Sequence, residues 1–113
     1  MRDSGWIQLF SENVQSVYDL LIMAFKIAEH EKVQLPVIVN YGGFVLTHTF
    51  EDVDVLDDET VINFIGKRRK VKYAITPERP LSIGMLGLPD SYMENKYEQN
   101  LAMKRAKKVI KEV

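Results

Sequence analysis

The chain has 113 residues, 46% hydrophobic and 27% charged, with a formal net charge of −1. These values are typical of one small globular domain and give no overall bias toward nucleic acid or anionic membranes. The absence of cysteine excludes disulfides, thiolate metal sites and a cysteine nucleophile, and it fits a reducing compartment. No signal peptide is evident, and the longest apolar run, Leu20–Phe25, is far shorter than the ~20 residues that span a bilayer. We therefore expect a soluble, cytoplasmic protein with no membrane partner.

The N-terminal part of the sequence predicts a strand–helix–strand unit. Residues 6–10 are aromatic and β-branched enough for a short strand. Apolar residues then recur at helical spacing from Val14 to about Glu31, and Pro36 excludes a longer helix. Residues 35–41 form a continuous apolar run, which is typical of a strand covered on both faces in a parallel sheet. A right-handed βαβ crossover is therefore expected.

The segment after this unit predicts a turn, a loop and a short helix. Gly42 and Gly43 end the second strand, where we expect unusual dihedral angles or a close approach to a neighbour. Residues 45–50 are expected to form a loop or a short extended piece. The acids at 57–60 favour the start of a short helix over 61–65, which the following glycine, Gly66, ends.

The remaining sequence predicts a linker and a helical tail. Residues 67–90 begin with a basic run and contain several prolines; 81–88 are a candidate extended segment, weakened by its glycines. Residues 91–113 predict a last helix whose apolar stripe drifts around its axis and has no obvious cover in this chain. The expected architecture is α/β: a partial α/β domain at 1–66, a linker at 67–90 and a helix at 91–113. We expect self-association or a partner surface, because an open sheet edge and an uncovered stripe favour contacts.

The histidines do not form a metal motif. His30 and His48 lack the spacing of paired zinc ligands, so a zinc site is not expected. His30 is interpreted as a solvated residue at a helix end. His48 is more interesting, because it follows a strand end of the kind where open α/β sheets bind ligands. The alternative, a histidine hydrogen-bonded to a loop carbonyl, is the commoner case.

Charged clusters have ordinary interpretations as well. Paired acids can divide acid and base roles, but a solvated run that starts a helix is favoured for this cluster: Glu51, Asp52, Asp54, Asp57, Asp58 and Glu59. The basic residues at 67–72 and 104–111 are the cue for nucleic acid, but aromatic stacking residues are not interleaved with them. Nucleic-acid binding is therefore not expected, and neither a phosphate loop nor a catalytic triad is present.

Four segments of the sequence form a set of motifs: DSGWIQ (3–8), ENVQSVYD (12–19), PVIVN (36–40) and GFVLTHT (43–49). In these segments the chain resembles the α subunits of pyruvate:ferredoxin oxidoreductases and their 2-oxoisovalerate-specific relatives. It implies part of the first, pyrimidine-side domain of a thiamine diphosphate enzyme, together with the linker toward the next domain. The parent reaction it implies is oxidative decarboxylation of a 2-oxoacid to acyl-coenzyme A, with ferredoxin as electron acceptor.

The resemblance also implies that the chain is a fragment without catalytic, cofactor-binding or metal-binding residues. The family's acid for the aminopyrimidine and its arginine for the substrate carboxylate precede the matching segment. Thiamine diphosphate, magnesium and iron–sulfur clusters would belong to other subunits, which fits the absence of cysteine. Gly43, Thr47 and His48 would form a loop at the edge of the active site.

The sequence departs from the family pattern at two positions near that edge. Gly42 stands where Asp is usual and Ser16 where Glu is usual, which weakens any role for an acid there. The expected role is therefore scaffold and interface, with the remaining α-subunit region, the other subunits and ferredoxin as partners of the parent enzyme. The alternative is a stand-alone α/β interaction module without catalysis.

Overall fold

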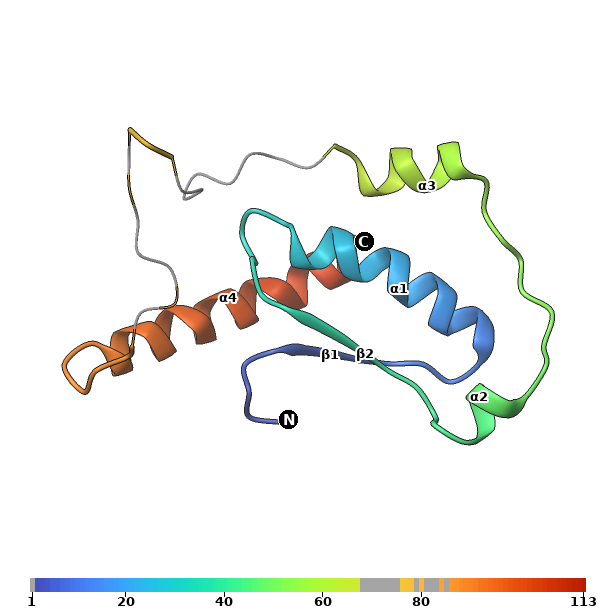
Figure 1. Ribbon diagram of the computed structural model, residues 1–113, viewed down its shortest axis with the longest axis horizontal. Coiled ribbons are helices and arrows are strands. Elements are labelled where there is room, and N and C mark those ends of the chain that lie inside the picture. Colours follow the sequence, from blue (N-terminus) through green and yellow to red (C-terminus); the bar gives the residue numbers. More distant parts are fainter. Residues whose placement is uncertain (1, 68–75, 79, 81–83, 85) are drawn as a thin grey trace.

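The computed structural model describes residues 2–67, 76–78, 80, 84 and 86–113 (Figure 1). The elements are β1 (Ile7–Phe10), α1 (Val14–Ala28), β2 (Val37–Asn40), α2 (Val45–His48), α3 (Asp58–Ile65) and α4 (Tyr92–Glu112). β1 and β2 are parallel, with Ile7 opposite Val37 and Phe10 opposite Asn40. The predicted βαβ unit is confirmed, and so is the α/β class with a C-terminal helix.

Helix α1 begins where the sequence predicts and ends earlier. Ala28 is its last residue, and the N–H of Glu29 caps it by donating to the carbonyl of Phe25 at 3.0 Å. The chain then reverses through a turn in which the carbonyl of His30 accepts from Val33 and Gln34. Gln34 has φ +47°, a left-handed conformation that an α-helix cannot contain. The predicted end near Glu31 is therefore wrong, because the reversal toward β2 needs those residues.

The core lies where β1, α1 and the C-terminal half of α4 meet. Its buried residues are Ile7, Ile27, Val33, Leu35, Ala102, Ala106 and Val109. The small side chains of Ala102 and Ala106 let α4 approach closely, and Arg105 Nε donates to the carbonyl of Lys32 at 2.8 Å. Figure 1 shows α4 running beside the βαβ unit with its C-terminal end near α1.

This packing corrects the expectation for the tail. The C-terminal half of the apolar stripe is covered within the chain, whereas Met93 and Tyr97 in the N-terminal half are exposed. The buried residues of α4 are Ala102, Ala106 and Val109. The drift of the stripe explains the difference, since a straight helix can present only part of a drifting stripe to one neighbour.

The sheet is less covered than the apolar run of β2 suggests. Every residue of β2 is half-buried, and Phe10 at the end of β1 is 74% exposed. Alternate residues such as Ile7, Leu9 and Val37 pack against the core, which leaves Phe10 on the opposite face. In the described part of the chain β1 and β2 pair only with each other, so the open sheet edge expected from the sequence is present.

The segment after β2 also differs from its prediction. Residues 45–48 form a single helical turn, α2, and not an extended piece. The hydroxyls of Thr47 and Thr49 donate to the carbonyls of Gly43 and Val45, four residues earlier, and close this turn. Neither Gly42 nor Gly43 has positive φ, and a Cβ on Gly42 would make only an ordinary contact with Leu46. Gly42 and Gly43 therefore do not adopt unusual dihedral angles.

Helix α3 follows the expected signals and packs on α1. Asp57 caps it, and Gly66 ends it with φ +77° and ψ 178°, a conformation essentially restricted to glycine. Lys26 of α1 places its Nζ 4.0 Å from the ring centroid of Phe64, a cation–π contact between the helices. The basic run at 67–72 and the candidate extended segment at 81–88 lie largely outside the described residues.

The isoleucines of α1 and α3 offer a matched test of the core. Ile27 is fully buried, whereas Ile62 is 66% exposed. We predict that Ile27→Ala lowers the free energy of unfolding by about 2–5 kcal/mol, because the residual cavity adds to the lost burial. Ile62→Ala should change it by less than about 0.5 kcal/mol. Urea denaturation of both variants measures the difference, and equal losses would contradict the assigned core.

Candidate functional site

The candidate site is the carboxyl edge of the sheet, defined here as residues 11–16 after β1 and 41–51 after β2. Ligands of open α/β sheets bind outside this end of parallel strands. Polar groups join the strand ends: the Ser11 N–H and hydroxyl donate to the carbonyl of Asn40 at 2.9 and 3.0 Å. The Asn40 amide donates back to the carbonyl of Leu9 at 3.2 Å. These bonds fix where each chain leaves the sheet.

The start of α1 at this edge is closed by a reciprocal cap. Asn13 Oδ1 accepts from the N–H of Ser16 at 2.8 Å, and Ser16 Oγ accepts from the N–H of Asn13 at 3.1 Å. Ser16 Oγ lies 3.0 Å from the N–H of Glu12 as well. A serine therefore performs the capping role that Glu or Gln usually has at this position. The departure from the family pattern at Ser16 thus leaves the helix start intact.

A segment after α2 is fastened along the first turns of α1, and we call residues 51–56 the strap. The carboxylate of Glu51 accepts from the N–H of Val14 at 3.3 Å, where the helix dipole favours an anion. Gln15 exchanges hydrogen bonds with the backbone of Asp54, and the Tyr18 hydroxyl accepts from the N–H of Leu56 at 3.1 Å. Glu51 therefore attaches the strap through its carboxylate, whereas Asp54 attaches it through backbone groups alone, and these bonds do not assemble an acid–base pair.

The predicted loop residues Gly43, Thr47 and His48 do come together. Thr47 Oγ1 donates to the carbonyl of Gly43 at 2.6 Å and lies 2.9 Å from Nδ1 of His48. The same Nδ1 is 3.0 Å from the carbonyl of Phe44, and the imidazole stacks on the Phe44 ring with centroids 5.1 Å apart. A histidine bonded to a loop carbonyl, the commoner alternative, is therefore what the structure shows. All of these side chains are exposed.

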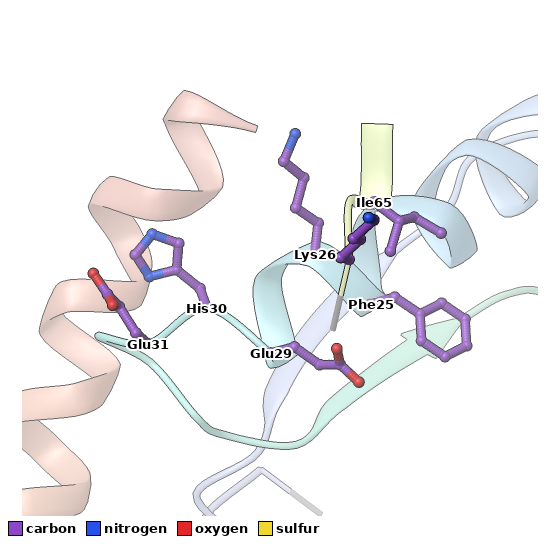
Figure 2. A pocket seen from close by; sticks show the side chains of 7 residues that line it. Phe25, Lys26, Glu29, His30, Glu31 and Ile65 are labelled. Atoms are coloured by element: carbon purple, nitrogen blue, oxygen red, sulfur yellow. The ribbon is translucent and has the colours of Figure 1, made fainter. Parts of the chain in front are cut away.

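His30 lies elsewhere, in a shallow hollow of roughly 120 Å³ at the other end of α1. Its Nδ1 accepts from the N–H of Lys32 at 3.2 Å. Figure 2 shows His30 and Glu31 beside α4, whereas Glu29 and Phe25 point toward a different side. The carboxylates do not converge on a common point, so this hollow lacks the arrangement of a catalytic or metal site.

The described side chains decide whether this part of the chain could hold a metal ion or a cofactor. Within the described ranges, no group of three or more His, Cys, Asp or Glu could hold a metal ion. The polar groups of the carboxyl edge are largely engaged with one another, as for Ser11, Asn13 and Glu51. The described residues of this edge therefore do not supply the ligands through which a divalent cation could hold a diphosphate.

Comparison with known proteins gives the family. The profile described as "Pyruvate flavodoxin/ferredoxin oxidoreductase, thiamine diP-bdg" matches residues 1–113. The chain belongs to this family. It is 46% identical over 111 residues to the pyruvate synthase subunit PorA of Pyrococcus furiosus, covering 98% of this chain and 28% of that protein.

Other relatives of the family are equally informative. The pyruvate synthase subunit PorA of Methanocaldococcus jannaschii is 47% identical over 112 residues, covering 99% of this chain and 29% of that protein. The ketoisovalerate oxidoreductase subunit VorA of Pyrococcus abyssi is 41% identical over 112 residues, with 99% and 28% covered. The chain thus spans little more than a quarter of the relatives it matches. The resemblance inferred from the motifs, to part of an α subunit, is confirmed.

Sequence reasoning missed the residues that attach the strap. Gln15 and Tyr18 bind backbone groups 38 or 39 positions away, and Tyr18 lies at helical spacing on the apolar stripe of α1. The available signal was the polar hydroxyl on that stripe, since a buried or half-buried tyrosine usually finds a hydrogen-bond partner.

No helix in the described ranges combines the length and apolar character required to cross a membrane.

Asp57, one of the clustered acids, is a helix cap with a testable pH dependence. The hydroxyl of Thr60, at 2.6 Å, and then the N–H of Thr60 hold the pKa of this carboxyl below its ordinary value. A lowered folded-state pKa means that the stabilisation is present above the unfolded pKa and is lost as the pH falls through the folded one. We predict that Asp57→Asn weakens the hydrogen-exchange protection of α3 at pH 7.

The difference between Asp57→Asn and the wild type should shrink as the pH falls below the ordinary carboxyl pKa of about 3.9, and it should disappear once the carboxyl is protonated in the folded state as well. The control is Asp52→Asn, an exposed acid of the strap that should leave the protection of α3 unchanged. Equal protection factors for wild type and Asp57→Asn at pH 7 would refute the capping role.

Proposed function

We propose that this chain forms part of the α subunit of a cytoplasmic 2-oxoacid:ferredoxin oxidoreductase. The larger enzyme would oxidatively decarboxylate a 2-oxoacid, transfer the acyl group to coenzyme A and pass the electrons to ferredoxin. The observation that carries this proposal is the family match over residues 1–113, with relatives named for pyruvate and for ketoisovalerate. Both kinds of relative support a 2-oxoacid as the substrate class.

The chain's own role in that enzyme is scaffold and interface. The polar groups of the carboxyl edge are used to fasten β1, β2, α1 and the strap together, which supports a structural part. Iron–sulfur clusters are assigned to other parts of the enzyme, since cluster ligation needs thiolates and this sequence has none. Thiamine diphosphate and its magnesium are assigned there as well, since no group of three or more acids or histidines among the described residues could hold a metal ion. We divide the chain into a partial pyrimidine-side domain at 1–66, a linker at 67–90 and a helix at 91–113.

Exposed apolar surface supports partner contacts. Apolar side chains exposed at the carboxyl edge and on the open sheet face are Phe10, Tyr41, Phe44, Val45 and Phe50. Exposed apolar side chains that gather on one surface often mark contact surfaces. We assign this surface to the remaining region of the α subunit and the other subunits, and, for the isolated chain, to self-association. The alternative of a stand-alone interaction module shares the surface but requires no catalytic assembly.

A segment exchange tests the proposed function. We predict that residues 1–113, placed in the Pyrococcus furiosus PorA subunit instead of the segment they match, retain ~10% or more of pyruvate oxidation, because cores tolerate exchange when their pattern is kept. The assay is coenzyme A-dependent reduction of a viologen dye by the assembled enzyme. The control rejoins the relative's own segment through the same junctions. Assembly without activity toward pyruvate or 2-oxoisovalerate would contradict the proposal.

Sedimentation equilibrium tests the contact surface. We predict that the isolated chain self-associates at micromolar concentration and that Phe10→Ser weakens this association, because Phe10 is 74% exposed on the open sheet face. The matched control is Ile62→Ser on α3, where an exposed isoleucine lies away from the sheet. A folded, strictly monomeric wild-type chain that melts cooperatively would favour the stand-alone module.

A further inference from the structure

The imidazole of His48 is exposed and nevertheless held in one orientation. Its Nδ1 lies 3.0 Å from the carbonyl of Phe44 and 2.9 Å from Thr47 Oγ1, and its ring stacks on Phe44 with an interplanar angle of 28°. An exposed side chain gains little stability from such contacts and loses rotamer entropy by making them. The bond to the loop carbonyl therefore contributes little to the stability of the fold, but it does set the orientation of the imidazole.

These contacts decide which ring nitrogen carries the proton. The carbonyl of Phe44 can only accept a hydrogen bond, so Nδ1 must donate to it. Thr47 has one hydroxyl proton and donates it to the carbonyl of Gly43 at 2.6 Å, so its oxygen also faces Nδ1 as an acceptor. Both partners favour a proton on Nδ1. In the neutral imidazole Nε2 is then the unprotonated, basic nitrogen.

The position of His48 suits a ligand contact. Helix α2 directly follows the carboxyl end of β2, the edge at which open α/β sheets bind ligands. Phe44 is 79% exposed, and a Cβ added at Gly43 would meet nothing within 4 Å, so the surroundings of α2 are open. Thr47 Oγ1 and the carbonyl of Phe44 orient the ring, and the carbonyl of Gly43 in turn holds the hydroxyl of Thr47. Catalytic bases are oriented by neighbouring groups in the same way.

We propose that Nε2 of His48 is the hydrogen-bond acceptor and base for the thiol that takes the acyl group. This inference rests on the proposed function. A 2-oxoacid offers only acceptors, in its carboxylate and its ketone, whereas the thiol offers an S–H donor that matches an unprotonated nitrogen. In the proton transfer the S–H bond breaks and an Nε2–H bond forms, giving a thiolate and an imidazolium. The thiolate is the nucleophile that acyl transfer requires.

The tautomer is tested on the isolated chain by ¹⁵N NMR of the imidazoles, with His48→Gln to assign the signals against His30. The expected result is a protonated Nδ1 and an unprotonated Nε2 for neutral His48. Thr47→Val should shift the population toward the other tautomer, and Thr47→Ser should restore it. A protonated Nε2 in the wild-type neutral ring would overturn the inference.

The thiol role is tested in the segment exchange with Pyrococcus furiosus PorA. His48→Gln and His48→Ala should lower kcat/KM for coenzyme A by about 10²-fold, the usual contribution of a general base. The first turnover of dye reduction by pyruvate, measured before the thiol is added, should be unchanged, because no thiol proton moves in it. The matched control, His30→Gln, should leave both rates as in the wild type.

The outcomes of this kinetic test are separable. Equal losses in the thiol-dependent and thiol-independent rates would show a structural role and overturn the inference, as would an unchanged kcat/KM for coenzyme A. An inactive wild-type exchange would instead contradict the proposed function, and the thiol role would fall with it, while the NMR measurement would still decide the tautomer.

Discussion

The buried contact between Ile27 of α1 and the alanines of α4 is the constraint on which the other elements depend. Ile27 is fully buried, and Ala102 and Ala106 present little beyond their backbone at this contact. A larger residue on α4 would move the helix away from β1 and the turn at 30–34, since packed interiors have no room for added volume. The position of α1 in turn sets where β1 and β2 end. The carboxyl edge is therefore placed by packing at the opposite end of α1.

Much of this fold follows from local sequence signals. The change from strand to helical period identified β1, α1 and β2, and Gly66 and Ser91 marked helix boundaries that the structure retains. The end of α1 could not be predicted, because Gln34 adopts a left-handed conformation that its residue type does not favour. Helix α2 was missed for a related reason, since threonine side chains favour its turn by bonding to backbone carbonyls and not through apolar spacing.

The candidate site was predictable in place but not in geometry. Family motifs brought Gly43, Thr47 and His48 to one loop, and the structure keeps them there. The orientation of the imidazole depends on rotamers and on a stack with Phe44 that no sequence spacing specifies. Similarly, Ser16 looked like a loss of an acid, whereas its hydroxyl completes the cap of α1.

The strap connects the start of α1 to the segment that follows α2. Its bonds go to Val14, Gln15 and Tyr18, all within the first turns of α1. The ends of helices open and close more readily than their centres, normally as local events. Opening of the first turns of α1 would release the strap, which Thr49 and Phe50 join to α2. The hydrogen bonds between α1 and the strap therefore also restrict the movement of the turn that carries His48.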